Sequence, residues 1–341
     1  MKRLFALLLL VWLAVPLAAE EAPSRVDLPD PLRFIGPDTV AIAVARARGE
    51  DEGFRQLINR ALTGAREAGG AGSLGALLNT FLSVGTQESM LLNALPLQWV
   101  RVDTVGPDGQ LNSCVAITLA GWRGLQSLVY SSMVTGKDGK PYELRRHRNE
   151  DIVLREDWQN PRSRMVFTRV KGTFLNCATP DQARYLVDRL LSKELEPVAN
   201  PLQVAYGHLD RQRDSYGVVL NRNGSLMRVL EWVNRPDTAR VRQAVGSERL
   251  DRVASTVESA SWTADVVSDD RVDIDVTFVT RSPEEARELA GVVEEAREVL
   301  DQGGRMGDFT LTLLPDGRVQ VGFAMIGFRE RVSRYLRTVT L

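Results

Sequence analysis

One of the two histidines of this chain lies close to two carboxylates. His208, Asp210 and Asp214 fall within seven residues, between predicted strands over 203–209 and 216–220. Imidazole and carboxylate groups that converge on one point are the ligands of zinc and related metals. A hairpin turn with solvated polar groups explains the same spacing. We favour the turn, and we predict no metal site.

The densest acidic patch consists of Asp269, Asp270, Asp273 and Asp275. Calcium needs six or more oxygens around one point, usually from a loop with a glycine at its sharp bend. The sequence has no such loop here. A hairpin turn followed by the outward polar face of a strand is therefore the interpretation that we prefer.

The strongest basic run contains Arg145, Arg146 and Arg148 around His147. It could bind an anionic partner such as a polysaccharide or a phosphate head group. Alternation along a strand would divide these side chains between two faces, and Glu143, Glu150 and Asp151 lie close by. A charged edge strand, protected from pairing with other chains, explains the run as well, and we favour it.

Motifs for covalent and cofactor chemistry are poorly represented. The sequence has no G-x-S-x-G, no P-loop and no C-x-x-C, and neither histidine stands in a recognisable triad context. Residues 70–75 match G-x-G-x-x-G, but they follow the helix-period segment 54–68, whereas a dinucleotide site needs a strand there. We predict no catalytic residue and no cofactor, although carboxylates drawn from distant segments could still assemble an active site.

Cys114 and Cys177 are the only cysteines. An even count in an oxidising compartment favours a disulfide. Strand phase argues against it, because Cys114 lies opposite Val115 and Ile117, whereas Cys177 falls on an apolar face. The sequence leaves two alternatives, a disulfide or two buried free thiols.

Capping signals locate the elements that would position these groups. Thr179-Pro180 and Ser282-Pro283 each read as an N-cap followed by proline at the first helical position, with Gln182 or Glu285 completing a capping box. Turns at 107–109 and 315–317 join pairs of alternating strands. The predicted helices span residues 52–67, 121–133, 180–192, 225–233, 283–301 and 327–337.

These signals recur about every 103 residues along the chain. They predict an α+β fold with antiparallel-rich sheets and helices on one face, built from two to three degenerate β-α-β-β-α units on the ferredoxin-like plan. The predicted divisions are a signal peptide over 1–19, an extension over 20–35, a first unit with an inserted hairpin over 36–163, a second unit with a connector over 164–252, and a third unit over 253–341.

The segment Gly36–Val44, GPDTVAIAV, together with the later [ST]-P-[DE]-x-A helix starts, resembles uncharacterised exported bacterial proteins of unknown function. The resemblance spans about residues 34–341. It rests on capping and turn chemistry, so it implies an exported domain and gives no catalytic residue.

The first nineteen residues are typical of a secretory signal peptide, with basic Lys2 and Arg3, an apolar run over 4–17 and small residues at Ala18 and Ala19. We expect cleavage after Ala19, a periplasmic or extracellular location and no transmembrane segment in the mature chain. A signal anchor that stays uncleaved is the alternative. A net charge of −1 gives no electrostatic case for nucleic acid as a partner.

These observations predict an exported, non-catalytic binding or scaffold protein, with an envelope protein or a polysaccharide as the kind of partner expected. The alternatives are a hydrolase of an unrecognised family, and a carrier of small ligands or lipids with an apolar pocket.

Overall fold

A computed structural model describes residues 28–46, 96–106, 109–119, 134, 142–155, 165–195, 197–233, 235–268, 270–301 and 306–327. The predicted signal peptide, the predicted helices over 52–67, 121–133 and 327–337, and the glycine motif at 70–75 lie outside these residues.

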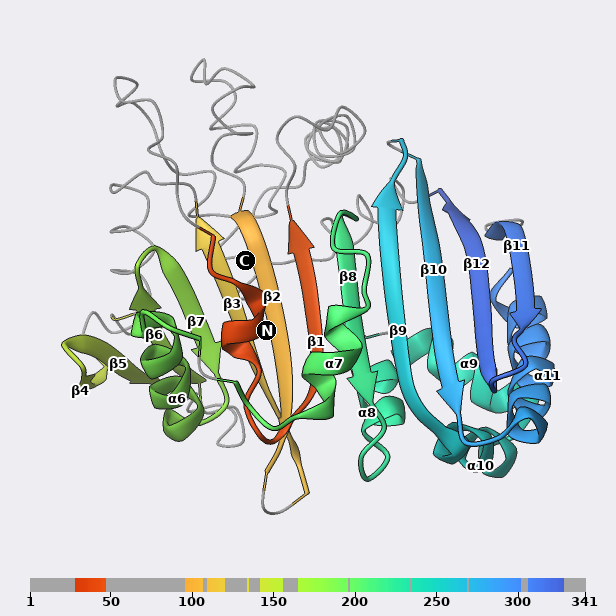
Figure 1. Ribbon diagram of the computed structural model, residues 1–341, viewed down its shortest axis with the longest axis horizontal. Coiled ribbons are helices and arrows are strands. Elements are labelled where there is room, and N and C mark those ends of the chain that lie inside the picture. Colours follow the sequence, from red (N-terminus) through yellow and green to blue (C-terminus); the bar gives the residue numbers. More distant parts are fainter. Residues whose placement is uncertain are drawn as a thin grey trace, which may run out of the picture.

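One antiparallel sheet of twelve strands dominates the molecule (Figure 1), which is consistent with an α+β fold. Its spatial order is β11-β12-β10-β9-β8-β1-β2-β3-β7-β6-β5-β4. The strands are β1 Thr39–Arg46, β2 Pro96–Val105, β3 Leu111–Leu119, β4 Glu143–His147, β5 Glu150–Arg155, β6 Met165–Val170, β7 Thr173–Cys177, β8 Ser215–Leu220, β9 Val257–Val266, β10 Arg271–Thr280, β11 Met306–Leu313 and β12 Arg318–Ile326.

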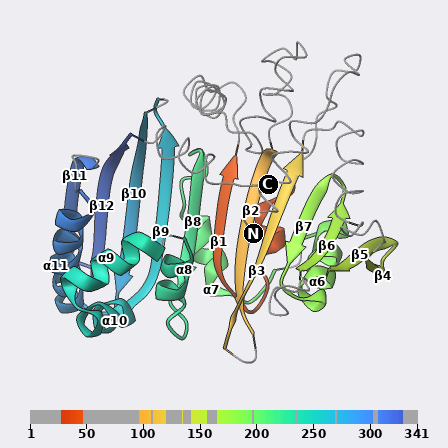
Figure 2. The same ribbon diagram turned by 180° about the vertical axis from the view of Figure 1, so that it is seen from behind.

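Helices cover opposite faces of the two halves of this sheet. In Figure 1 the short helix η1, α6 and α7 lie in front of the sheet, whereas Figure 2 shows α8 to α11 on the other side. We call the first side the α6 face and the second the α11 face. The helices are η1 Pro31–Phe34, α6 Pro180–Leu191, α7 Pro201–Gly207, α8 Ser225–Val233, α9 Arg235–Val245, α10 Ser247–Thr256 and α11 Pro283–Leu300.

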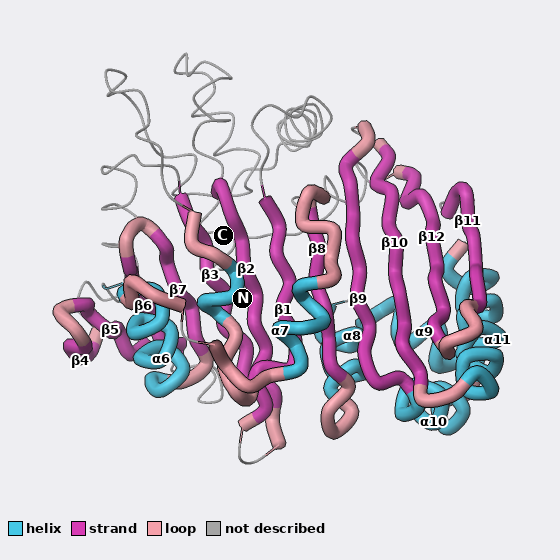
Figure 3. The backbone as a smooth tube through the Cα atoms, viewed as in Figure 1, coloured by secondary structure: helices cyan, strands magenta, loops and turns pink. Residues whose placement is uncertain are grey.

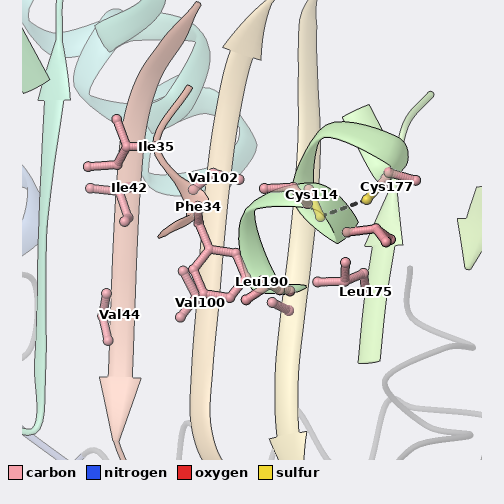
Figure 4. Close-up of a cluster of buried hydrophobic side chains, with 14 of the residues drawn as sticks. Phe34, Ile35, Ile42, Val44, Val100, Val102, Cys114, Leu175, Cys177 and Leu190 are labelled. Carbon is pink, nitrogen blue, oxygen red and sulfur yellow. Dashed lines mark hydrogen bonds between the residues drawn. The ribbon is translucent and has the colours of Figure 1, made fainter. Parts of the chain in front are cut away.

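Each half has its own hydrophobic core. Ile42, Val100 and Leu175 pack on the α6 face against α6 and η1 (Figure 4). Val257, Val319 and Leu289 pack on the α11 face of the other half. Strand β8 belongs to both, because alternate residues of a strand point to opposite faces. Tyr216 and Val218 enter the first core, and Val219 enters the second.

Both predicted N-caps are confirmed, whereas the reciprocal bonds of the capping boxes are not: Gln182 Oε1 accepts from the N–H of Ala178 at 3.2 Å, and Glu285 Oε2 has no partner among the described residues. Thr179 Oγ1 accepts from the N–H of Gln182 at 3.2 Å, and Ser282 Oγ accepts from the N–H of Glu285 at 3.3 Å. The helices that start there, α6 and α11, have nearly the predicted bounds, as does α8.

The strand predicted over 203–209 is wrong, because helix α7 occupies this segment. Asn200 caps α7 by accepting from the N–H of Leu202 at 2.9 Å, and Pro201 takes the first helical position. A hairpin follows α11, but α6 is followed by α7 and the single strand β8. The ferredoxin-like repeats are therefore not evident in this part of the chain.

The strand order has a different regularity, since it is palindromic about the β1–β8 pair. Outward from this seam, one half reads β1-β2-β3-β7-β6 and the other reads β8-β9-β10-β12-β11. In each half the strand at the seam is followed outward by one hairpin, β2–β3 or β9–β10. A second hairpin, β6–β7 or β11–β12, comes next, and its later strand (β7 or β12) lies beside the first hairpin. The predicted inserted hairpin, β4–β5, extends the first half to the sheet edge.

Within the described ranges, no helix combines the length and the apolar character that crossing a bilayer requires.

Candidate functional site

A line of polar side chains crosses the α6 face near one end of the sheet, where strands β1, β3 and β9 finish and β2, β7, β8 and β10 begin. We call it the polar row. Its members are Thr173, Thr118, Gln98, Arg46, Asp214, Asp265 and Asp273.

Strand register assembles the polar row from distant parts of the chain. Arg46 is opposite Gln98, and Gln98 is opposite Thr118. On the other side, the N–H of Arg46 donates to the carbonyl of Asp214 at 2.9 Å. Side chains directly opposite one another in an antiparallel pair lie about 5 Å apart at Cβ. Arg46 therefore stands between an amide and a carboxylate.

Arg46 ends a strand whose earlier residues on this face, Ile42 and Val44, are fully buried. Its guanidinium lies 5.8 Å from the ring centroid of Tyr216. The Nε atom is buried and has no hydrogen-bond partner, and no carboxylate among the described residues forms an ion pair with this side chain. The guanidinium of Arg46 thus lies against the ring of Tyr216.

Gln98 is 1% exposed, and within the part of the chain that the structure describes neither its Oε1 nor its Nε2 has a hydrogen-bond partner. An unsatisfied buried polar group costs about 1–3 kcal/mol of stability. Such a group in a native fold calls for an explanation, such as a bound water, an ion or a ligand. The neighbouring Thr118 and Thr173 satisfy each other, with their Oγ1 atoms 2.9 Å apart.

A shallow hollow of about 370 Å³ opens beside Arg46. Besides Arg46 it is lined by Leu209, Asp210, Arg211 and Gln212, which belong to the loop between α7 and β8, pink in Figure 3. We call it the arginine hollow. Arg211 lies 5.9 Å from the ring centroid of Tyr206, so both guanidinium groups rest against buried tyrosines.

The two tyrosines form a rigid base beneath these arginines. Tyr206 and Tyr216 are both 0% exposed, and the hydroxyl of Tyr206 donates to that of Tyr216 at 3.4 Å. Burial, together with the hydrogen bond to Tyr216, raises the pKa of Tyr206 well above its usual range. The phenol therefore stays protonated at neutral pH and does not act there as a base.

Two carboxylates on the acidic side of the polar row accept hydrogen bonds from the backbone. Asp214 Oδ2 accepts from the N–H of Val266 at 2.8 Å, and Asp265 Oδ1 accepts from the N–H of Asp214 at 3.1 Å. Arg213 makes an ion pair with Asp265, and this contact raises the pKa of Arg213. These carboxylates hold the loop in place.

The structure does not bring His208, Asp210 and Asp214 to one point. His208 is an exposed residue at the C-terminus of α7. Asp210 accepts from the N–H of Gln212 at 3.0 Å and from Arg213 Nε at 3.2 Å, whereas Asp214 is buried and binds Val266. Among the described residues, no three His, Cys, Asp or Glu side chains are arranged to hold a metal ion.

The other charged runs are paired with neighbours. Asp273 accepts from Arg271 Nε at 2.7 Å, and Asp275 is exposed on the same strand. Asp270 lies in the preceding turn, and Asp269 is outside the described residues. In the edge strand β4 and its turn, every arginine faces a carboxylate: Arg145 with Glu143 at 2.9 Å, Arg146 with Asp151 at 3.4 Å, and Arg148 with Asp188 at 2.6 Å.

Cys114 and Cys177 lie directly opposite each other on β3 and β7, both buried on the α6 face (Figure 4). Their Sγ atoms are 2.9 Å apart, and the structure has them as thiols. Burial, reinforced by the contact with Cys177, raises the pKa of the Cys114 thiol well above its usual range. The phase argument from the sequence placed them on different faces and was wrong, because Cys114 shares its face with Ala116.

The sequence analysis missed Arg46, Gln98 and Arg211. A signal was available for the first two, since each continues an apolar alternation: Arg46 follows Ile42 and Val44, and Gln98 precedes Val100 and Val102. A polar residue in the apolar phase of a strand predicts a buried polar group. The pairing of the two strands was not available from the sequence.

Comparison of the chain with protein-family models, with curated proteins and with solved structures found no match, so the geometry of its own residues is the basis on which a function can be argued.

Proposed function

We propose that the protein is a non-catalytic binding protein, which takes its ligand in the arginine hollow on the α6 face. The observation that carries the proposal is the pair Arg46 and Arg211. Both line the hollow, both stack on buried tyrosines, and neither has an ion-pair partner among the described residues. Binding sites place a small number of polar groups on a rigid support, and here the sheet supplies that support.

Two competing functions have less support. A hydrolase needs a base aligned with a nucleophile or with a bound water. His208 is exposed, and Asp210 is already engaged by Arg213. A lipid carrier needs an apolar cavity, whereas four of the five described residues that line the hollow are polar or charged.

We also propose that this binding takes place outside the cytoplasm, in the periplasm or the extracellular space, with an envelope protein or a polysaccharide as the source of the ligand. The support is the order of basic, apolar and small residues over 1–19. N-terminal sequencing of the exported protein should give Glu20 as the first residue. Membrane-bound protein that retains Met1 would contradict this part of the proposal.

We also propose an internal repeat of two units, one on each side of the β1–β8 pair, in place of the ferredoxin-like units predicted from the sequence. The palindromic strand order about β1 and β8 supports it. An experimental structure should let β1, β2, β3 and β7 superpose on β8, β9, β10 and β12. Halves that fail to superpose would leave the strand order as a coincidence.

A ligand screen combined with an activity screen tests the binding function. The mature protein is heated in the presence of sugars, organic acids, phosphorylated compounds and fatty acids, and is assayed against peptide, ester, glycoside and phosphate substrates. We expect one class of compound to raise the melting temperature, with no turnover. Turnover that is lost when His208, Asp210 or Asp214 is changed would overturn the proposal.

A further inference from the structure

The described lining of the arginine hollow holds two arginines and one carboxylate, so its formal charge is positive. That carboxylate, Asp210, is held by Arg213 and by the N–H of Gln212. Asp214, next to Arg46 in the polar row, accepts from the N–H of Val266. Arg46 and Arg211 are therefore the groups of the hollow that can engage an incoming anion.

A second, independent observation comes from Gln98. It stands opposite Arg46 on the same face, it is 1% exposed, and both polar atoms of its amide lack a partner within the described ranges. Its Nε2 is a donor beside the buried Nε of Arg46, which also lacks a partner. Buried polar groups without partners indicate that a bound group is missing. The two donors, Gln98 Nε2 and Arg46 Nε, would take an acceptor, and Gln98 Oε1 would take a donor such as the hydroxyl of a protonated oxyanion or a water.

Resting on the function proposed above, we propose that the ligand of the arginine hollow carries an oxyanion, a phosphate, sulfate or carboxylate group, bound between Arg46 and Arg211 with Gln98 as a further donor. Guanidinium groups bind such anions through two parallel charge-assisted hydrogen bonds. Stacking on Tyr216 and Tyr206 restricts both arginines before the ligand arrives, which reduces the entropy lost on binding.

The size of the hollow agrees with a small ligand. Its volume of about 370 Å³ is near the lower end of the range for small-molecule sites. An oxyanion occupies part of this volume, and the remainder can take the adjoining portion of a small molecule or of a lipid head group against Leu209.

Calorimetric titration of the mature protein with inorganic phosphate, sulfate and acetate tests the proposal, with sodium chloride used to hold the ionic strength constant. We expect at least one of these anions to bind with a stoichiometry of one. Arg46→Gln and Arg211→Gln should each weaken binding by about tenfold or more. Arg222→Gln is the matched control, because Arg222 is exposed at the opposite end of β8 and should leave the affinity unchanged.

Gln98→Leu separates a role in binding from a role in folding. Replacing an unsatisfied amide by an apolar side chain should raise the melting temperature of the free protein, since the buried polar group is removed. The same variant should bind the anion more weakly. A variant that is less stable, with unchanged affinity, would contradict the assignment of Gln98.

Vesicles distinguish a head group from a free anion. Binding to phosphatidylglycerol vesicles that inorganic phosphate displaces, with phosphatidylcholine vesicles as the control, would support a lipid head group as the source. Binding of phosphate without vesicle binding would support a soluble ligand. Absence of binding to every anion and vesicle, or full affinity in both arginine variants, would overturn the proposal. If a neutral compound bound the hollow in place of an anion, the proposed oxyanion ligand would be wrong, but the proposed binding function would not be contradicted.

Discussion

The tripeptide Arg-Val-Asp occurs once in each half of the sheet, and the two copies have opposite surroundings. Arg101 and Asp103 lie on β2 in the first half, and Arg271 and Asp273 lie on β10 in the second. In both, the residues are two apart on one strand, so their side chains share a face and form an ion pair, at 2.9 Å in β2 and 2.7 Å in β10.

Burial separates the two pairs. The side chains of Arg101 and Asp103 are 5% and 3% exposed, whereas those of Arg271 and Asp273 are 38% and 40% exposed. Desolvation lowers the pKa of Arg101 despite the opposing effect of Asp103, and the hydrogen bond to Asp273 raises the pKa of Arg271. The pKa of the arginine is therefore set mainly by desolvation in the first half of the sheet and mainly by the hydrogen bond to its aspartate in the second half.

This difference shows why an ion pair has no fixed stabilising value. A buried charge that loses its partner retains its full desolvation cost, whereas an exposed charge is rehydrated. The predictions below test how far the two halves differ, beginning with the largest expected effect.

Removing the buried carboxylate should have the largest effect. Asp103→Ala removes the buried carboxylate to which both Arg101 and Ser113 donate. We expect a loss of about 3–5 kcal/mol in the free energy of unfolding, measured in urea. Replacing both Arg101 and Asp103 by apolar residues of similar volume should lose much less. If the single and double variants were equally unstable, desolvation would not be the cause.

The cysteine pair would allow the first half of the sheet a crosslink that the second half cannot form, since the two cysteines of the chain lie in β3 and β7. In an oxidising compartment we expect a disulfide between Cys114 and Cys177 worth about 2–4 kcal/mol relative to the reduced chain. Mass spectrometry of the exported protein and urea unfolding with and without reductant measure both quantities. Two free thiols in the exported protein would contradict the prediction.

Alkaline pH should weaken the first half through its tyrosine pair. The pKa of Tyr206 is raised in the folded protein, so its contribution to stability is fully present below the unfolded pKa of about 10 and is lost as pH rises above it. We expect Tyr206→Phe to reduce the slope of unfolding free energy against pH above 10 by about 1.4 kcal/mol per pH unit. An unchanged slope would show that Tyr206 ionises normally.

The helix caps provide a comparison in which the halves should agree. Thr179 and Ser282 make equivalent hydrogen bonds at the starts of α6 and α11. Thr179→Ala and Ser282→Ala should each cost about 1 kcal/mol in chemical unfolding. Costs that differ severalfold would mean that one of the two helices is held mainly by its packing.

The exposed copy of the tripeptide should give the smallest effect. Asp273→Asn removes the ion pair of Arg271, but water replaces it and Asp308 remains beside the guanidinium at 2.8 Å. We expect the urea midpoint to stay within error of the wild-type value at physiological salt. A marked shift of the urea midpoint would show that the exposed ion pair stabilises the protein as much as the buried one does.

The sequence predicted those elements whose ends carry strong local chemistry. The starts of α6 and α11 depend on caps and prolines within a few residues, and they are confirmed. The segment of α7 carries the same kind of signal, because Asn200-Pro201 is also an N-cap followed by proline at the first helical position. Residues whose role depends on register, such as Arg46 beside Gln98, could not be found from local patterns.

The central seam between β1 and β8 also bears on how the chain acquires its fold as it emerges. Ala41 pairs with Val219, so β1 cannot pair with β8 until nearly two-thirds of the chain has been produced. Until then the growing sheet presents β1 as an open edge, with the row of unpaired backbone groups that invites association with other chains. Pairing between such distant segments is intrinsically slow. A holding chaperone that shields this edge would therefore have its greatest effect before β8 appears.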